Sequence, residues 1–176
     1  MLLVGNTPCE GGPKTMHCNQ LTADEELTQM AIWSMASAPL FMSNDLANVP
    51  AASKRILQHK GLLAINQDPL GRMCFRFLNR TSHDGVQGWK KELAGGDVAV
   101  VLLNMGSTGL PIGAIAFDFA DVGFAPDTRV TVRDVVTQKD FGWFTGSYTS
   151  RRTIASHGAA VLRLSFTPQY PSPREL

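Results

Sequence analysis

Apolar side chains recur with a helical period in the segment that follows residue 22. Thr22 and Glu25 have the spacing of a capping box, in which the threonine hydroxyl and the glutamate carboxylate bind free N–H groups at a helix start. Apolar residues then continue at i, i+3 and i+4 from Leu27, and others make the segment apolar on most sides. We therefore expect a helix that ends before Pro39 and is buried against a large neighbour.

Two further elements are expected after this helix. The run Leu40-Phe41-Met42 is apolar without alternation, which is typical of a strand buried on both faces. A second helix is predicted to begin near Pro50, to direct Ile56 and Leu57 inward and to stop at Gly61. Helix, buried strand and helix in this order indicate an α/β layer.

The apolar pattern changes to a strand period near Gly71. Residues 131–135 and 161–165 alternate apolar and polar side chains, as half-buried antiparallel strands do, and the glycines at 95–96 and 158 mark reversals. The segments expected to be strands are Val98–Leu103, Ile112–Phe119, Arg129–Val136, Ser147–Thr153 and Ala159–Phe166. Five to eight such strands predict a small antiparallel β-sandwich or open barrel. The whole chain is thus expected to be α+β.

Composition and charge exclude several classes of partner. The 176 residues are 44% hydrophobic. They include 16 basic and 15 acidic residues, and the Lys and Arg residues form no clustered run. This balance predicts no nucleic-acid partner and no anionic membrane partner. The longest apolar stretches are far shorter than the roughly 20 residues that span a bilayer. The start at Met1 has no basic region or cleavage site, so we expect no signal peptide in this chain.

The cysteines leave two interpretations open. Cys9 and Cys18 bracket a Gly/Pro-rich loop that could close as a disulfide. A metal site formed by these two cysteines with His17 and Cys74 is the alternative, but the paired short spacings of structural zinc sites are absent. We expect neither a metal nor a cofactor. Asn79 begins an Asn-x-Thr sequon, which is a glycosylation site if the chain enters the secretory pathway.

The carboxylates of the chain favour structural roles over catalysis. Residues 24–26 are acidic and lie at a predicted helix start, where the helix dipole stabilises negative charge. Asp45 follows the expected buried strand, where barrel enzymes place their chemistry, but its Ser-Asn-Asp setting is also that of a turn. Asp68 precedes a proline in a turn-like segment, and His157 precedes a glycine between two strands. We therefore predict no catalytic residue among them.

Eight short motifs resemble glycoside hydrolase family 27, the family of α-galactosidases and α-N-acetylgalactosaminidases. Four are similar to the last part of that family's catalytic (β/α)₈ barrel, and four are similar to its antiparallel C-terminal domain. In chain order they are MLLVGN at 1–6, LTQMAIW at 27–33, APLFMSNDL at 38–46, AINQDPLG at 64–71, GDVAVVLLN at 96–104 following Trp89, RVTVRDVV at 129–136, GWFTGSYT at 142–149 and SHGAAVLRLSF at 156–166. The resemblance implies a barrel remnant over residues 1–71 and a β-sandwich domain over residues 72–176.

The resemblance also implies an activity. Family members are retaining glycosidases that cleave terminal α-linked galactose or N-acetylgalactosamine with two aspartates, a nucleophile and an acid/base. Both aspartates correspond to positions upstream of Met1, so we expect this chain alone to be inactive. Met1 corresponds to a family residue that makes an apolar contact with the sugar. The family pattern further implies a galactoside-bearing glycan as partner, a homodimer in the full-length form, and a lysosomal or secreted location.

A second interpretation treats the chain as a non-catalytic protein. In it the β-domain binds carbohydrate or assembles with a partner, and Trp89, Trp143 and Tyr148 offer aromatic surface to a sugar. The competing expectation for these aromatic side chains is core packing. The β-domain is large enough to bury its own core, whereas the helix and strand near residues 25–42 would face water without the rest of a barrel.

Overall fold

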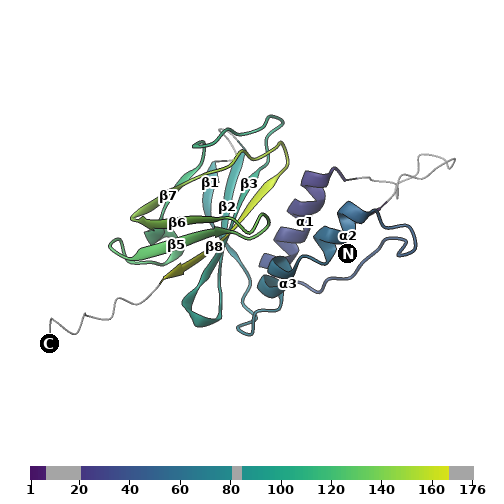
Figure 1. Ribbon diagram of the computed structural model, residues 1–176, viewed down its shortest axis with the longest axis horizontal. Helices are drawn as coiled ribbons and strands as arrows, with labels where there is room; N and C mark the ends of the chain where they lie inside the picture. Colours follow the sequence, from purple (N-terminus) through teal and green to yellow (C-terminus); the bar gives the residue numbers. More distant parts are fainter. Residues whose placement is uncertain (7–20, 81–84, 167–176) are drawn as a thin grey trace.

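Helices and strands are arranged in three layers in the computed structural model, which describes residues 1–6, 21–80 and 85–166 (Figure 1). Helices α1, α2 and α3 lie beside one face of a six-stranded antiparallel sheet with strand order β1-β2-β3-β8-β5-β6. The two-stranded antiparallel sheet β4-β7 covers the opposite face. This is the α+β fold with a β-sandwich that the sequence predicts.

The observed bounds of the helices and strands show which elements the sequence predicted correctly. The helices are α1 (Ala23–Met35), α2 (Ala51–Leu57), α3 (Lys60–Asn66) and the single turn α4 (Phe119–Val122). The strands are β1 (Phe75–Arg80), β2 (Val86–Glu92), β3 (Val98–Asn104), β4 (Ala116–Asp118), β5 (Arg129–Asp134), β6 (Asp140–Thr145), β7 (Ser147–Thr149) and β8 (Ala159–Phe166). The predictions for β3, β5 and β8 are confirmed within two residues. Within the described ranges, no helix has the length and apolar character needed to cross a membrane.

Strand β3 separates two hydrophobic cores. Side chains of successive strand residues point to opposite faces, so the even-numbered residues from 98 to 102 pack toward the small sheet. The odd-numbered residues from 99 to 103 pack toward the helices. Every residue of β3 is buried. Burial on both faces explains why this antiparallel strand has the uninterrupted apolar sequence VAVVLLN instead of an alternating one.

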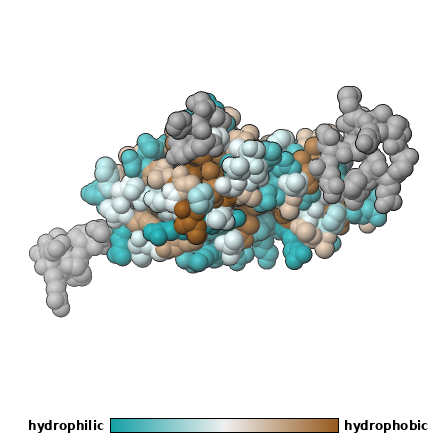
Figure 2. Space-filling view, turned by 90° about the horizontal axis from the view of Figure 1, so that it is seen from above, coloured by the Kyte–Doolittle hydropathy of each residue, from teal (hydrophilic) through white to brown (hydrophobic). Residues whose placement is uncertain are grey.

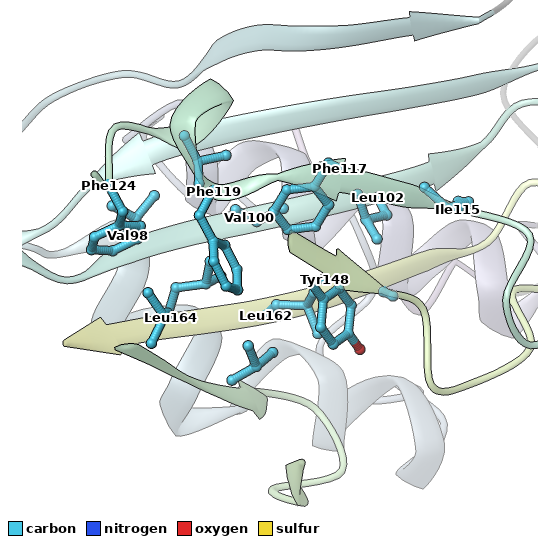
Figure 3. Packing of buried hydrophobic residues seen from close by; sticks show 14 of the residues in the cluster. Val98, Val100, Leu102, Ile115, Phe117, Phe119, Phe124, Tyr148, Leu162 and Leu164 are labelled. Atoms are coloured by element: carbon cyan, nitrogen blue, oxygen red, sulfur yellow. The ribbon is translucent and has the colours of Figure 1, made fainter. Parts of the chain in front are cut away.

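Aromatic side chains fill the core between the two sheets (Figure 3). The ring of Phe117 on β4 lies 5.4 Å from that of Phe77, 6.2 Å from that of Phe119 and 5.7 Å from that of Tyr148, measured between centroids. Edge-to-face and tilted arrangements at such distances add to the stabilisation from burial alone. Tyr148 is only 1% exposed, so core packing, not sugar binding, is its role.

Helix α1 begins at the predicted capping box and packs on the large sheet. The backbone N–H of Glu25 donates to the Thr22 hydroxyl at 3.3 Å, and the Thr22 N–H donates to the Glu25 carboxylate at 2.8 Å. Met30, Ala31 and Met35 are fully buried against β3 and β8. The expectation that this helix would face water without further barrel elements is therefore wrong, because the sheet covers its most apolar side.

The second predicted helix is two helices. The chain breaks at Gln58 and His59, and the His59 ring accepts a hydrogen bond from the Leu62 N–H at the start of α3. Gly61 lies inside α3 and does not end the preceding helix, so that prediction is wrong. A Cβ at Gly61 would lie 2.6 Å from a Val135 methyl group, which shows that this glycine permits close packing of α3 on the chain after β5.

Three predicted strands differ from the observed ones. The run at 40–42 forms a single bridge, and its side chains are not buried on both faces, since Phe41 is 68% exposed. Only Ala116–Asp118 of the predicted 112–119 strand is extended in a sheet, because α4 begins at Phe119. The strand predicted over 147–153 ends at Thr149. Periodicity alone does not show where a short apolar run leaves its sheet.

A buried lysine joins the helical layer to the sheet. Lys91 on β2 is 1% exposed, and its ammonium donates to the Ser34 carbonyl at 3.2 Å, to the Ser37 hydroxyl at 2.8 Å and to the Ile65 carbonyl. The two carbonyls lie in the last turns of α1 and α3, where helix dipoles favour a cation. Burial lowers the pKa of Lys91, and the nearby Asp68 charge opposes that shift.

Candidate functional site

The first residues of the chain form a parallel pair with the segment after α1. The Leu2 N–H donates to the Phe41 carbonyl at 2.7 Å, and the Ser43 N–H donates to the Leu2 carbonyl at 3.1 Å. This is a single parallel bridge between Leu2 and Met42, with helix α1 in the connection between the two bridged segments. Strand, helix and parallel strand is the repeating unit of a β/α barrel. The parallel pair is the candidate functional site.

Polar side chains after Met42 fix the position of the first strand. The Ser43 hydroxyl donates to the Leu2 carbonyl at 2.9 Å, and the Asn44 amide donates to the Val4 carbonyl at 2.6 Å. Asp45 instead accepts from the backbone N–H of Ala47 and the side chain of Asn48. Asp45 is thus a turn residue, as predicted, because its carboxylate oxygens bind groups of the turn itself.

Helix α1 contributes two side chains to the same strand. The Glu26 carboxylate, 7% exposed, accepts from the Gly5 N–H at 2.6 Å, and the Gln29 side chain accepts from the Leu3 N–H at 2.7 Å. Gly5 has φ +84°, and a Cβ there would lie 2.9 Å from a Val49 methyl group. The sequence identified Glu26 only as an acidic residue near a helix start. Its contact with Gly5 could not be predicted, because the two residues are 21 positions apart.

The other acidic candidates also bind structural groups. Asp68 accepts from the backbone N–H of Leu70 and of Ala94, and so joins the end of α3 to the turn after β2. Glu25 accepts from Thr22 and also pairs with the His157 ring at 3.0 Å. The Thr22 backbone hydrogen bond and then His157 lower the pKa of Glu25. These placements agree with the structural roles expected for them.

The remaining predicted site residues are not brought together. Met1 is 71% exposed beside the parallel pair, and Asn79 is exposed on β1. Cys9 and Cys18 lie outside the described residues, as does His17 of the alternative metal site. Cys74 is buried as a free thiol, and burial raises its pKa. Within the part of the chain that the structure describes, no three His, Cys, Asp or Glu side chains are grouped to hold a metal.

An apolar groove of about 550 Å³ lies between α1 and strands β2 and β3. Its lining includes both Trp33 and Trp89, and the Trp89 indole N–H donates to the Gln87 side chain at 3.1 Å. Trp143 lies elsewhere, on β6, with the Arg129 guanidinium 4.7 Å from its ring centroid. The three aromatic residues considered for sugar binding therefore occupy three separate places.

Two family models match successive parts of the chain. The model described as "Alpha galactosidase A" matches residues 15–68, and the model described as "Alpha galactosidase C-terminal beta sandwich domain" matches residues 83–164. They occur in the order in which the structure places the helical layer and the sandwich. The chain belongs to glycoside hydrolase family 27. The resemblance seen in the eight motifs is thereby confirmed.

Curated members of family 27 include relatives of this chain from distant organisms. Human alpha-galactosidase A is 32% identical over 151 residues, which cover 85% of this chain and 34% of the human protein. A probable alpha-galactosidase of Dictyostelium discoideum is 32% identical over 168 residues, covering 95% of this chain and 39% of that protein. The chicken relative, 32% identical over 119 residues, is named an alpha-N-acetylgalactosaminidase. This chain thus spans little more than a third of the length of the first two relatives.

Solved family 27 structures share the fold. Alpha-galactosidase I of Mortierella vinacea superimposes with a TM-score of 0.73 and 25% identity over 82% of this chain and 36% of that chain. A family 27 β-L-arabinopyranosidase of Geobacillus stearothermophilus superimposes with a TM-score of 0.76 over 96% of this chain and 37% of that chain. At 17% identity the second likeness concerns the fold alone.

Proposed function

We propose that this chain is the C-terminal part of a retaining α-galactosidase and that it acts on terminal α-linked galactose only together with an upstream barrel. The observation that carries this proposal is the parallel bridge between Leu2 and Met42. Parallel strands are covered on both faces in α/β proteins. Here Leu2 is 1% exposed, whereas Met42 and Phe41 are 40% and 68% exposed, so the segment at 41–42 lacks the cover that further barrel elements would supply on its two faces.

The chemistry follows from the geometry that retaining glycosidases need. One carboxylate attacks the anomeric carbon while the second protonates the departing oxygen, and the two groups stand about 5–5.5 Å apart. Both aspartates are proposed to lie in the upstream barrel. The carboxylates of Glu26, Asp45 and Asp68 all accept hydrogen bonds from the protein itself, which supports this assignment. Met1 is proposed to make an apolar contact with the bound sugar.

Further parts of the proposal concern the whole protein. The barrel part is proposed to end at Gly71, and a disulfide is proposed between Cys9 and Cys18. Asn79 is exposed on β1, which supports its proposed glycosylation in a lysosomal or secreted protein. The full-length form is proposed to be a homodimer. N-acetylgalactosaminide is the alternative substrate, since relatives of both names match this chain.

Hydrolysis of p-nitrophenyl α-galactoside and of the corresponding N-acetylgalactosaminide tests the proposal. The 176-residue chain is compared with an extended protein, in which the part of the Dictyostelium relative upstream of the matched region is joined before Met1. We expect turnover by the extended protein only, and the ratio of the two rates identifies the preferred sugar. Turnover by the chain alone would contradict the assignment of both aspartates to the upstream barrel, and Asp45→Asn would then be the variant to assay.

A further inference from the structure

A small hollow of about 210 Å³ lies between helix α3 and strands β5 and β8. Residues of α3 and Val135 form its apolar wall, and its polar lining consists of Arg133, Gln138 and Arg163. Among the residues that the structure describes, no carboxylate belongs to this lining. Apolar patches are visible over the sheet and over the helical end in Figure 2, so apolar surface does not distinguish this hollow. Its distinguishing feature is the pair of arginines.

The two arginines face each other across neighbouring strands. Arg133 on β5 is directly opposite Arg163 on β8 in the antiparallel ladder. Side chains at opposite positions share a face, with Cβ atoms about 4.5–5.5 Å apart, and like charges in such a pair destabilise a sheet. The Arg133 guanidinium donates to Asp140 on β6 at 3.0 Å, and the Arg163 guanidinium donates to Asp97, the residue before β3, at 2.6 Å. Strands β6 and β3 are on opposite sides of the pair, so each carboxylate binds one arginine and neither bridges both.

Most donors of the arginine pair are left for a ligand. Arg133 binds Asp140 through Nη1 only, and Arg163 binds Asp97 through Nε only. A guanidinium carries more N–H groups than these bonds use, and the others have no protein acceptor within residues 1–6, 21–80 and 85–166. The side chains of Arg133 and Arg163 are 47% and 44% exposed, so a solute can reach them. The two ion pairs orient the guanidiniums in advance, which lowers the entropy cost of binding.

Gln138 adds an amide to the same hollow. It lies in the turn between β5 and β6 and has φ +58°, a left-handed conformation that is uncommon for residues other than glycine, asparagine, aspartate and histidine. Such backbone strain occurs most often at binding and active sites. The Gln138 amide has no hydrogen-bond partner in the part of the chain that the structure describes, so its N–H groups are available to an acceptor.

We propose that Arg133, Arg163 and Gln138 form a binding site for a tetrahedral oxyanion, a phosphate or sulfate group. The planar forks of guanidiniums match the oxygen atoms of such a group, and an anion between two opposed arginines offsets their repulsion. A cavity of about 150 Å³ accepts one benzene ring, so about 210 Å³ has room for one oxyanion with bound water. This site goes beyond the proposed glycosidase activity and does not depend on it.

The oxyanion has two possible sources, a free ion and a substituent of a sugar. Trp143 on β6 is opposite Thr131, which is two positions before Arg133 on β5. Trp143 is therefore a diagonal neighbour of Arg133 on the same face of the sheet, within reach of long side chains. Its indole is 45% exposed and offers an apolar surface to a sugar ring. A phosphorylated or sulfated sugar would use this second surface, whereas a free ion would not.

Thermal unfolding of the 176-residue chain tests the site with inorganic phosphate and sulfate, each compared with chloride at equal ionic strength. A ligand that binds only the folded protein raises the melting temperature by mass action. Both anions also stabilise proteins in general, because they are excluded from protein surfaces. Variants separate the two effects. Arg133→Gln and Arg163→Gln each remove a fork from the site, whereas Arg129→Gln removes the same charge from the same face of β5 outside the hollow. The rise from chloride to phosphate is measured within each variant, so a difference in starting stability does not affect the comparison.

At about 20 mM phosphate or sulfate we expect the rise in the unmodified chain and in Arg129→Gln to exceed that in Arg133→Gln and Arg163→Gln by about 3 °C or more. Equal rises in all these proteins would overturn the oxyanion site. The hydrolysis assay is independent of this result, so the proposed function would still stand.

Galactose 6-phosphate and unsubstituted galactose distinguish the two sources. A larger rise with galactose 6-phosphate than with inorganic phosphate, lost in Trp143→Ala, would support the site and assign it to a sugar substituent. Equal rises with the two phosphates would support the site and assign it to a free ion. A rise with unsubstituted galactose as large as that with galactose 6-phosphate would contradict recognition of the anion.

Discussion

Replacing Lys91 by methionine removes the cation between the helices and the sheet while keeping a side chain of similar length. The ammonium makes three hydrogen bonds, to Ser34, Ser37 and Ile65. The Ser34 carbonyl also accepts from the Ser37 N–H, and the Ser37 hydroxyl also donates to Arg72. The Ile65 carbonyl is therefore the acceptor most dependent on the lysine.

The expected loss follows from two opposing terms. A buried acceptor that loses its donor costs about 1–3 kcal/mol. Removal of the ammonium also removes the cost of burying a charge, which largely offsets the attraction in its hydrogen bonds. We therefore expect Lys91→Met to lower the free energy of unfolding by about 1–3 kcal/mol, or roughly 2–4 °C per kcal/mol in melting temperature for a chain of this size.

The pH dependence gives a second, sharper criterion. Burial lowers the pKa of Lys91 in the folded protein, so between that pKa and the ordinary lysine value the unfolded chain binds more protons. The contribution of Lys91 to stability therefore rises with pH in this window and is smallest below it. The deficit of Lys91→Met relative to the unmodified protein should grow as the pH is raised from 7 toward 10.

Urea unfolding followed by circular dichroism at several pH values measures this deficit. Lys90→Met is the matched control, because Lys90 is the neighbour on β2 and its ammonium binds the Asp121 carbonyl at a solvent-exposed position. The control should change stability by less than about 0.5 kcal/mol. Our reasoning would be refuted by a Lys91→Met protein as stable as the original, or by a deficit that is constant or shrinks as the pH rises.

Three further expectations concern the core, a helix terminus and a thiol. Phe117→Ala should lower the free energy of unfolding by about 3–5 kcal/mol in urea, since the ring contacts three other aromatic rings, and a loss below about 1 kcal/mol would contradict the packing described. Glu25 has a lowered pKa, so its contribution to stability is present above the usual pKa of 4.5 and is lost as the pH falls through the pKa of the folded protein. In that acidic range Glu25→Gln should reduce the change of melting temperature with pH. An unchanged slope would argue against the capping contact. Cys74 is buried with a raised pKa, so peptide mapping should show alkylation by iodoacetamide only after unfolding, and rapid reaction in the folded protein would show that the site opens.

Local signals in the sequence were strong enough to predict several elements. Thr22 and Glu25 fix the start of α1 because a capping box acts over three residues. The run from Val98 predicts β3, and the alternation near Leu162 predicts β8, because strand periodicity is also local. The family could be inferred from eight motifs in order, since such a series has many independent matches.

Features that depend on distant partners could not be predicted. Lys91 has the sequence context of an exposed strand residue, and only the fold places the ends of two helices around it. Gly61 resembles the glycine that ends a helix. Its role in packing could not be predicted, because its actual neighbour, Val135, is 74 residues away in the chain. The same reason explains the wrong expectation for α1, whose apolar side has a partner in β3 and β8 that no local pattern names.

The packing of α1 against β8 has a consequence for synthesis of the chain. Met30 and Met35 are buried against a layer that includes Val161, which is made roughly 130 residues later. At about 5–20 residues per second, these side chains leave the ribosome about 7–26 seconds before their cover exists. Throughout that interval the apolar helix is available to chaperones and to other nascent chains. The order of elements along this chain therefore makes the yield of folded protein depend on what binds α1 first.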